Sequence, residues 1–508
     1  MNNNQNEKLV LSIDCGTQSL KALVFDKNGN LLAKSKIEYE PYFSLNPGWA
    51  EQDPFVYWKS LCKALKEIKS NKPDIFNSIS GIVVTTIRDT YVTLDENLKS
   101  NRACILWLDQ RMAQANIKLK FIHWLMFYIS GMLRTIKIAM KKSRLNWIKE
   151  YEPDVFKNTK KILMLSGFLT FKLTGVLKDS TASQIGYVPF DYKNRRWERN
   201  RKHWRWYVFG IEPEMVVELV EPTTTIGYVN EEAALETGLN VGIPVFAGGT
   251  DKGCESLGNG CISEDEATIS LGTSATIQIT TKRYFEPIRF YPSYPAVIPN
   301  YYNPEIHIFR GYWMISWFKK EFATHEVNEA SKLNISPEEL LNKRILEIKP
   351  GSHGLILEPY WNPPLKIPDA KGAIIGFGDV HTRIHFYRAI IEGIGFALLE
   401  GLEQIERKSH KKVKKIYISG GGSQSDVICQ ITADLFNRPV YKNSIYDASG
   451  LGGAIIGFVA LNVYNNFNDA IKNMVFHNKV FFPNKNNAII YKKLYKKVYK
   501  KIFKKLYP

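Results

Sequence analysis

The stretch LSIDCGTQSLKALVFD (residues 11–26) places two β-prone segments on either side of a short polar turn. The turn contains an acid at Asp14, a glycine at Gly16 and hydrogen-bonding side chains at Thr17 and Gln18. Glycine lets the backbone approach a ligand closely, and the amides that follow can then donate to phosphate oxygens. Asp14 would hold a divalent cation beside those phosphates, because Mg²⁺ takes few protein carboxylates. We therefore predict a phosphate and metal site, with a plain hairpin closed by Asp14 as the alternative.

A second copy of this pattern occurs in the other half of the chain. The segment TISLGTSATIQIT (residues 268–280) again places Gly-Thr, here Gly272 and Thr273, between two β-prone runs. The copies are separated by about half the chain, as a duplicated fold would require. At 508 residues the chain also exceeds the size at which one hydrophobic core keeps growing. We therefore predict two related domains, residues 1–252 and 253–508, with a nucleotide cleft between them.

Secondary-structure patterns in both halves favour a mixed α/β architecture. The first half indicates a strand hairpin with an Asn-Gly turn at 28–29, a helix over 54–70 and a strand over 80–87. In the second half a long helical pattern at 386–408 precedes a strand at 414–422, whose glycines lead into another helix. Because strands alternate with helices, the predicted fold class is α/β with mixed sheets.

Two further glycine-rich turns suggest ligand contacts. In SGGGSQSD (residues 419–426) the glycines follow a strand and precede a helix, which suits contact with adenosine through the backbone and the helix N-terminus. This cluster has neither the lysine of a P-loop nor the spacing of a dinucleotide-binding fingerprint. In FAGGTDKGCESLG (residues 246–258), Asp251 follows a glycine turn, so we expect its carboxylate to project into the cleft as a general base. A helix N-cap without catalytic function is the alternative.

The composition is that of an ordinary globular protein. Hydrophobic residues make up 44% and charged residues 23% of the chain. The six cysteines are scattered without a CxxC pair, so we expect neither a zinc site nor a disulfide framework. The polar start MNNNQNEK lacks the apolar core of a signal peptide and is expected to be a frayed leader. The longest apolar run, 121–133, is too short to cross a bilayer, and we predict a soluble cytoplasmic protein.

The net charge of +18 invites comparison with proteins that bind nucleic acid or anionic membranes. Eight lysines lie in YKKLYKKVYKKIFKKLYP (residues 491–508), where apolar residues recur at helical spacing. We predict a C-terminal helix that docks its apolar stripe on the protein, with no nucleic-acid or membrane partner. Membrane or polyanion binding by this helix is the alternative. The segment 112–142, rich in lysine and aromatic residues, is predicted to be a helical excursion near the substrate site or a homodimer contact.

Motifs that cover nearly the whole chain resemble those of a known family, in its order and spacing. The family is that of the FGGY carbohydrate kinases, within the superfamily that includes actin, hexokinase and the heat-shock chaperone ATPase. The matching motifs are LSIDCGTQSLKALVFD, PGWAEQDPFVYW, ILWLDQR, FAGGTDKGCESLG, ISLGTSA, YRAIIEGIGFALLEGLE and YISGGGSQSD.

This resemblance implies two ribonuclease-H-like domains of the actin-like ATPase superfamily, with ATP and Mg²⁺ bound in the cleft. The N-terminal domain would bind the sugar and the C-terminal domain the ATP. Asp251 would take the proton of the substrate hydroxyl, and Asp14 would hold the metal ion. The phosphates would contact Gly16, Thr17, Gln18, Gly272 and Thr273, and the adenosine would contact Gly421, Gly422 and Ser425.

The resemblance also indicates where the substrate binds. Arg88 and Asp89 in VVTTIRDTYVTLD lie where the family has its substrate-contacting pair, which resembles Met-His in xylulose kinases and Arg-Glu in glycerol kinases. An arginine beside a carboxylate can hold a diol as donor and acceptor; a surface ion pair is the alternative. Trp107, with Asp109 and Arg111, is expected either to shape the sugar pocket or only to pack. Overall likeness favours a ketopentose such as xylulose, with glycerol or another polyol as the alternative.

Two functions of other classes share part of this pattern. An actin-like filament or chaperone-type ATPase would also bind ATP between glycine turns, but it would not need the Arg88–Asp89 pair. A non-enzymatic protein that binds polyanions through its basic tail would need neither Asp251 nor the turns. Because both are intact, the sequence favours transfer of the γ-phosphoryl group of ATP to a primary hydroxyl.

Overall fold

The structure is a computed structural model that describes residues 8–116, 119–361 and 370–506. Apart from its last residue, Lys8, the predicted N-terminal leader lies outside the described residues. The chain packs into two compact units, each made of several segments. Unit 1 comprises residues 1–258, 292–302 and 447–475, and unit 2 comprises residues 259–291, 303–446 and 476–508.

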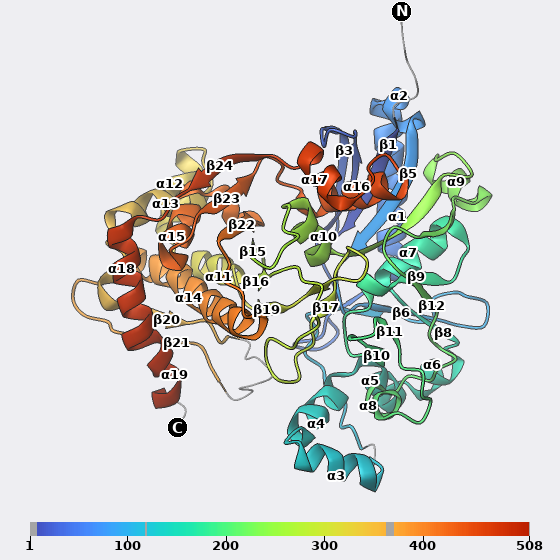
Figure 1. Cartoon of the computed structure of the whole chain (residues 1–508), viewed down its shortest axis with the longest axis horizontal. Coiled ribbons are helices and arrows are strands. Elements are labelled where there is room, and N and C mark those ends of the chain that lie inside the picture. The colour runs from blue at the N-terminus through green and yellow to red at the C-terminus, as the bar shows by residue number, and fades with distance from the viewer. Residues whose placement is uncertain (1–7, 117–118, 362–369, 507–508) are drawn as a thin grey trace, which may run out of the picture. The chain divides into compact units, whose positions relative to one another are not determined.

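A mixed sheet forms the centre of unit 1 (Figure 1). In spatial order its strands are β13 (Thr225–Tyr228), β14 (Pro244–Thr250), β5 (Ile79–Thr86), β1 (Leu9–Cys15), β2 (Ser19–Phe25) and β3 (Leu31–Glu38). The strands β1, β2 and β3 form an antiparallel meander, whereas β5 and β14 run parallel to β1. At the far edge, β13 pairs antiparallel with β14.

Unit 2 contains a sheet with the same arrangement. In spatial order its strands are β19 (Glu305–Ile308), β16 (Ala275–Gln278), β15 (Glu266–Leu271), β22 (Lys415–Ser419), β23 (Val440–Asn443) and β24 (His477–Phe481). Again the first three strands along the chain are antiparallel, the next two run parallel to the first, and the outer strand is antiparallel. Both sheets place three antiparallel strands and two parallel strands in one spatial order, whereas the outer strand precedes its neighbour along the chain in unit 1 (β13 before β14) and follows it in unit 2 (β24 after β23). The five corresponding strands confirm the predicted duplication, and the mixed sheets with their helices confirm the α/β fold class.

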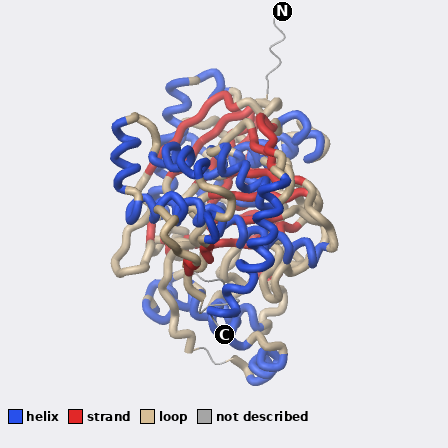
Figure 2. The backbone as a smooth tube through the Cα atoms, turned by 90° about the vertical axis from the view of Figure 1, so that its left-hand side faces the viewer, coloured by secondary structure: helices blue, strands red, loops and turns tan. Residues whose placement is uncertain are grey.

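The remaining elements of unit 1 are short strands and helices. In Figure 2, helices (blue) lie around the strands (red) of the chain. The short strands are β4 (Glu51–Gln52), β6 (Tyr91–Leu94), β7 (Cys104–Ile105), β8 (Lys161–Met164), β9 (Lys178–Ser180), β10 (Phe190–Asp191), β11 (Arg196–Trp197), β12 (Glu218–Val220) and β17 (Tyr294–Pro295). The helices are α1 (Pro54–Asn71), α2 (Pro73–Asn77), α3 (Phe121–Ile129), α4 (Leu133–Lys142), α5 (Arg144–Tyr151), α6 (Pro153–Asn158), α7 (Leu165–Thr174), α8 (Trp204–Phe209), α9 (Glu231–Thr237), α10 (Asp251–Gly258), α16 (Ala448–Ala460) and α17 (Phe467–Met474).

Unit 2 likewise has helices around its sheet. Its helices are α11 (Trp313–Phe322), α12 (Thr324–Lys332), α13 (Pro337–Arg344), α14 (Arg383–Ser409), α15 (Asp426–Phe436), α18 (Lys485–Leu494) and α19 (Lys500–Leu506). The hairpin β20 (Ile356–Glu358) and β21 (Ala373–Ile375) lies apart from the central sheet, and β18 (Tyr302–Asn303) spans the boundary of the two units.

The elements predicted from hydrophobic patterns are present. The Asn-Gly turn joins β2 to β3, with Gly29 at a φ of 79°. The helix predicted over 54–70 is α1, and the strand predicted over 80–87 is β5. In the second half, the long helical pattern forms α14. The predicted strand at 414–422 ends as β22 at Ser419, and its glycines form a 3₁₀ turn before α15.

Helices cover both faces of the unit 1 sheet. Leu11 and Ile13 of β1 belong to a hydrophobic cluster with Tyr57 of α1. The intervening residues Val10 and Ser12 lie under α16, which contacts β1 through its glycine-rich side. Because alternate residues of a strand point to opposite faces, α1 and α16 lie on opposite sides of the sheet.

Close contact between α10 and α16 fixes the start of α10. A Cβ atom on Gly452 would lie 1.9 Å from the carbonyl oxygen of Cys254, and one on Gly258 would lie 1.9 Å from that of Ala448. Any larger residue at these positions would push the helices apart. The backbones therefore touch, and a segment from the C-terminal part of the chain holds Asp251, the first residue of α10, in place. Unit 1 thus differs from the contiguous residues 1–252, because residues 253–258, 292–302 and 447–475 pack with it.

The predicted C-terminal helix docks through one face within unit 2. Tyr491, Tyr495 and Tyr499 are buried and pack on Phe396 of α14, with ring-centroid separations of 6.1, 5.9 and 5.3 Å. The lysines between them are exposed. The predicted docking is thus confirmed from Tyr491 to Ile502, whereas Leu506 is 44% exposed and residue 507, the last apolar position of the pattern, lies outside the described residues.

Two global features bear on function. All six cysteines are buried thiols outside disulfides. Within the described residues, no helix has both the length and the apolar character that crossing a bilayer would require.

A buried acid supports the loop beside β14. Asp179 in β9 accepts hydrogen bonds from the Ser166 hydroxyl (3.0 Å), the Ser180 amide (2.7 Å) and the Gln184 side chain (2.8 Å). The Ser180 hydroxyl in turn donates to the carbonyl of Gly248 in β14 (2.7 Å). Burial outweighs these hydrogen bonds and raises the pKa of Asp179 to about 7.

This pKa predicts that stability falls as pH rises from about 4 to about 7. In the unfolded chain Asp179 ionises at its ordinary pKa of 3.8, whereas the folded protein keeps the proton up to a pKa of about 7. The folded state therefore binds more protons in this window, and the loss reaches about 4 kcal/mol at one site. Asp179→Asn cannot ionise, so its free energy of unfolding should decline less with pH in denaturant titrations. Equal pH slopes in the two proteins would contradict the prediction.

Candidate active site

Several predicted site residues meet at one edge of the unit 1 sheet. The parallel strands β1, β5 and β14 are adjacent, and their carboxyl ends lie in register. Asp14 lies at the end of β1, Arg88 and Asp89 follow β5, and Asp251 follows β14 directly. Ligands of α/β sheets bind at the carboxyl ends of parallel strands. The fold of unit 1 thus brings these four residues together.

Asp14 lies among other acids. The Lys21 ammonium is 3.6 Å from Asp14 Oδ2 and 3.0 Å from Asp447 Oδ1. Burial raises the pKa of Asp14, Lys21 lowers it, and the neighbouring Asp251, Asp447 and Glu255 raise it again. A divalent cation bound beside Asp14 would offset the repulsion among these carboxylates.

The acids around Asp14 suit a cation that arrives with phosphate groups. Among the described residues, no group of three or more His, Cys, Asp and Glu side chains could hold a metal ion. Mg²⁺ usually takes only one or two protein carboxylates and completes its shell with water and phosphate oxygens. Asp14 and its acidic neighbours meet that requirement, so these residues fit a nucleotide-bound Mg²⁺.

The Gly16 turn has the features of an anion site. Its ends are closed by a hydrogen bond from the Gly16 amide to the Ser19 carbonyl (2.9 Å). Within the described part of the chain, the amides of Thr17 and Gln18 donate to no protein acceptor. The Trp107 indole donates to the Thr17 hydroxyl (3.0 Å). A predicted phosphate turn and a predicted sugar-pocket residue therefore lie side by side.

Asp251 occupies the first position of α10, directly after β14. Its Oδ1 accepts a hydrogen bond from the amide of Lys252 (2.8 Å), as a residue at a helix start can. Among the described residues, no donor contacts its second carboxylate oxygen. Lys252 itself pairs with Glu255 (2.8 Å). Asp251 thus keeps one oxygen available for a substrate proton while the backbone fixes the other.

Arg88 and Asp89, which are predicted to bind the substrate, contact different side chains of the protein. The Arg88 guanidinium lies 5.5 Å from the centre of the Tyr294 ring. Asp89 has a left-handed backbone conformation, with a φ of 50°, and its carboxylate accepts a hydrogen bond from the Tyr91 hydroxyl (2.5 Å). Burial raises the pKa of Asp89, whereas Arg144 lowers it.

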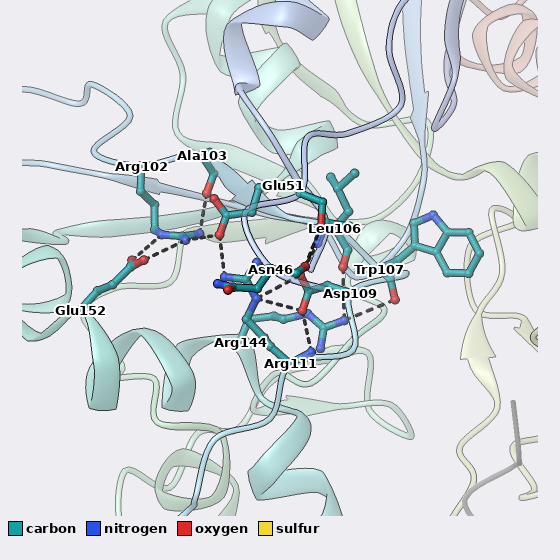
Figure 3. Close-up of polar contacts among 12 residues, drawn as sticks. Asn46, Glu51, Arg102, Ala103, Leu106, Trp107, Asp109, Arg111, Arg144 and Glu152 are labelled. Carbon is teal, nitrogen blue, oxygen red and sulfur yellow. Dashed lines mark hydrogen bonds and ion pairs between the residues drawn. The ribbon is translucent and has the colours of Figure 1, made fainter. Parts of the chain in front are cut away.

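Arg144, which the sequence did not reveal, contacts one residue of the predicted substrate pair. Its guanidinium lies 3.3 Å from Asp89 Oδ2 and donates to the carbonyls of Leu106 (3.4 Å) and Trp107 (3.3 Å). Figure 3 shows the two contacts with these carbonyls, with the Trp107 indole directed away from them. Arg144 is buried at the start of α5. It therefore connects the backbone of Trp107 to the carboxylate of Asp89.

Asp109 and Arg111 support the Trp107 loop from behind. The Arg111 guanidinium binds Asp109 (2.8 Å) and Glu51 (2.5 Å), and Glu51 also binds Arg102 (2.9 Å), as Figure 3 shows. Asp109 further accepts from the amide of Ala50 (2.6 Å). These side chains are almost fully buried. Of the three residues singled out in this motif, Trp107 alone contacts a predicted ligand-binding turn, through Thr17.

Unit 2 contains the second Gly-Thr turn at the end of β15. The Gly272 amide donates to the Ser274 carbonyl (3.0 Å), which parallels the closure of the Gly16 turn. The carbonyls of Gly272 and Thr273 accept from the amides of Tyr312 and Trp313 at the start of α11. Thr273 is exposed, and within the described residues its amide donates to no protein acceptor. The local geometry again leaves an amide for an anion.

A cavity of about 230 Å³ lies beside the third glycine cluster, at the carboxyl ends of the parallel strands β22 and β23. Its lining includes Ser423, Gln424, Asn443 and Tyr446. A Cβ atom on Gly421 would meet only the Tyr446 hydroxyl, at 3.9 Å, so the backbone there is open to a ligand.

The other two residues that are predicted to contact adenosine, Gly422 and Ser425, make contacts within the protein. Gly422 packs under the ring of Tyr312, and the Ser425 hydroxyl accepts from the amide of Ile428 (3.4 Å) as the N-cap of α15. Contact of all three predicted residues with adenosine stays a prediction, as does the joint use of both Gly-Thr turns by one nucleotide.

Comparison with known proteins gives matches over almost the whole chain. Residues 9–258 match the FGGY family of carbohydrate kinases, N-terminal domain, and residues 267–461 match the C-terminal domain of the same family. The chain is 28% identical to the xylulose kinase of Lactococcus lactis subsp. lactis (strain IL1403), over 96% of this chain and 94% of the relative. It is also 28% identical to the gluconokinase of Bacillus licheniformis, over the same shares of the two chains.

A solved structure has the same fold. The crystal structure of xylulose kinase from Rhodospirillum rubrum superposes with a TM-score of 0.83 at 23% identity, over 98% of this chain and 99% of that chain. This likeness confirms the two-domain α/β fold.

Proposed function

Because the chain belongs to the FGGY family of carbohydrate kinases and is an ATP-dependent sugar kinase, we propose that it phosphorylates a primary hydroxyl of a small sugar. A ketopentose such as xylulose is the first acceptor that we propose, and the xylulose kinase among its relatives supports this choice. One observation supports the proposal: the ends of β1, β5 and β14 bring Asp14, the Arg88–Asp89 pair and Asp251 to one edge of a sheet, and we propose that they hold the metal, bind the acceptor and act as the base.

Asp251 acts as the general base in this proposal. Its second carboxylate oxygen takes the proton of the attacking hydroxyl, and the hydroxyl oxygen forms a bond to the γ-phosphorus while the bond to the bridging oxygen of ADP breaks. The Lys252 amide holds the other oxygen of Asp251, so the base keeps a fixed orientation. Positioning and charge neutralisation supply most of the remaining rate acceleration.

The nucleotide is proposed to bind through backbone amides. Thr17, Gln18 and Thr273 offer amides for phosphate oxygens, and the glycine turn beside the cavity in unit 2 is proposed to contact the adenosine through Gly421, Gly422 and Ser425. Mg²⁺, when bound with ATP beside Asp14, would neutralise part of the charge on the transferred phosphoryl group.

The sugar is proposed to lie against Arg88, Asp89 and Trp107. Asp89 would accept from one hydroxyl and Arg88 would donate to its neighbour, while the indole would pack on the sugar carbons. An aldonate such as gluconate is the second candidate, because Arg144 and Lys142 place positive charge beside Asp89. A gluconokinase among the relatives agrees with this alternative.

A coupled assay of ADP release tests the reaction and the acceptor together. The full chain is assayed with ATP and Mg²⁺ against ketopentoses, hexuloses, gluconate, glycerol and other polyols. ADP release that depends on a ketopentose supports the first proposal, and preference for gluconate or a polyol would replace the acceptor. ADP release at the same rate without any sugar would instead favour an ATPase of the actin or chaperone type.

Arg88→Ala is expected to raise the KM for the preferred acceptor by about tenfold, with little change in the KM for ATP. The reason is that the guanidinium donates to the acceptor in the proposed complex, whereas the nucleotide contacts other residues. Initial-rate kinetics with each substrate varied in turn measure both constants. Arg283→Ala serves as a control from unit 2, where Arg283 lies 5.7 Å from the centre of the Phe285 ring and donates to the carbonyl of Ser409, the last residue of α14. Equal changes in both KM values would mean that Arg88 does not contact the acceptor.

A further inference from the structure

One helix of unit 1 presents a continuous apolar surface to solvent. We call it the α3 face, and Figure 1 shows α3 and α4 at the end of unit 1 that lies beyond α5 and α8. The exposed fractions of its side chains range from 38% to 77%. The α3 face consists of Phe121, Ile122, Trp124, Leu125, Met126, Tyr128 and Ile129. Exposed apolar patches of this kind mark interaction surfaces in native proteins.

The opposite side of the helix is well packed. Phe127, the buried residue of α3, forms a small core with Ile136 and Met140 of α4 and Val208 of α8. Asn146 supports this core by donating to the carbonyls of Met140 (2.9 Å) and Val208 (2.8 Å). The helix pair is therefore a folded element with its own core, and the exposed apolar side chains are a surface of that element.

The charged side chains of the segment that contains α3 and α4 are all positive. Residues 112–142 contain six lysines and arginines and no aspartate or glutamate. Lys120 precedes α3, and Arg134, Lys137 and Lys141 lie exposed on α4. Glu150, an acid of the neighbouring α5, is held by the amides of Gln114 and Ala115 (both 2.8 Å). Any partner of this surface must therefore offer apolar contact and negative charge together.

We propose that the α3 face and the basic residues of α4 bind the surface of an anionic lipid bilayer. Helices that lie in the bilayer interface combine bulky apolar and aromatic residues with lysine and arginine. Tryptophan and tyrosine side chains are enriched at the level of the lipid headgroups. Each basic residue near an anionic leaflet adds to the attraction. A second copy of this chain fits less well, because a twofold contact would bring two surfaces of the same positive charge together. The proposal does not depend on the sugar, and it assigns membrane contact to α3 instead of the lysine-rich C-terminal helix.

Vesicle flotation of the full chain tests this proposal. The vesicles are phosphatidylcholine with phosphatidylglycerol, and pure phosphatidylcholine serves as the reference. We expect binding to the anionic vesicles that weakens as salt increases. Lys137→Glu with Lys141→Glu should reduce partitioning by about tenfold or more. Lys492→Glu with Lys496→Glu is the matched control, because these exposed lysines have the same i, i+4 spacing and the same charge change on another helix. Equal losses in the two variants would overturn the proposal, since general basicity would then explain the binding.

A second pair of variants tests the apolar part. Ile122→Ser with Ile129→Ser, at positions 71% and 77% exposed, should reduce vesicle binding and leave the thermal unfolding temperature and kinase activity unchanged. Leu235→Ser with Val241→Ser removes two exposed apolar residues elsewhere in unit 1, which are 86% and 59% exposed, and should not affect binding. Failure of the unmodified chain to float with anionic vesicles would overturn the proposal. A dimer in sedimentation velocity that Ile122→Ser with Ile129→Ser dissociates, without vesicle binding, would assign the face to a second copy instead.

Discussion

Asp251→Asn is expected to lower sugar-dependent turnover by about 10²- to 10⁴-fold while ATP still binds. Asparagine keeps the shape of the side chain and can still accept the Lys252 amide, which contacts Asp251 Oδ1 at 2.8 Å. It cannot take the proton of the attacking hydroxyl, so the loss should appear in kcat and leave the acceptor KM nearly unchanged. Steady-state rates of ADP release and calorimetric titration with a non-hydrolysable ATP analogue measure the two effects separately.

A matched variant in the same helix separates base catalysis from charge. Glu255→Gln removes one negative charge one turn further along α10, where Glu255 pairs with Lys252. We expect it to change turnover by less than about tenfold, because Glu255 has no role in proton transfer. Turnover close to normal in Asp251→Asn would refute the role of Asp251, and equal losses in both variants would indicate a general electrostatic effect.

Local chemistry made much of the fold predictable from the sequence. The Asn-Gly turn before Leu31 requires positive φ, which Gly29 adopts, and this fixes the β2–β3 hairpin. The repeated Gly-Thr turns predicted two copies of one sheet, and five strands of the two sheets have the same order, whereas the outer strand does not. The composition of unit 1 was not predictable in this way. Residues 447–475 join unit 1 through backbone contact between α10 and α16 at Gly452. A glycine in a helical pattern does not indicate which other helix it will contact.

The candidate site was predictable where it depends on residues next to a strand end. Asp14 and Asp251 directly adjoin or end strands, so the pattern of strands placed both at the carboxyl edge of one sheet. Arg144 was not predictable, because it lies far along the chain from Asp89 and follows an ordinary run of lysines before α5. Only the packing of α5 brings its guanidinium to the carbonyl of Trp107. Long-range contacts of this kind leave no spacing signal in one sequence.

Arg144→Ala is expected to lower kcat/KM for the acceptor by about 10²-fold or more, with the KM for ATP nearly unchanged. Removing one partner of a buried ion pair typically costs about 3 to 5 kcal/mol, because the remaining charge has no compensation. Here Asp89 would lose the guanidinium at 3.3 Å, and the Trp107 backbone would lose a donor. Arg144 touches no reacting atom in the proposed complex, so it acts as a positioning residue for Asp89 and Trp107.

A pH profile distinguishes this role from a loss of folding. Arg144 lowers the pKa of Asp89 against the opposing effect of burial, so Arg144→Ala should raise that pKa further. If ionised Asp89 accepts a sugar hydroxyl, acceptor binding weakens as pH falls through its pKa, and the acid limb of kcat/KM should move to higher pH in the variant. Arg144→Lys keeps the charge but cannot reach Asp89 and two carbonyls at once, so its acid limb should move less while its acceptor KM still rises. An acid limb that stays at the same pH in Arg144→Ala would show that the guanidinium does not control the charge of Asp89 in the working enzyme.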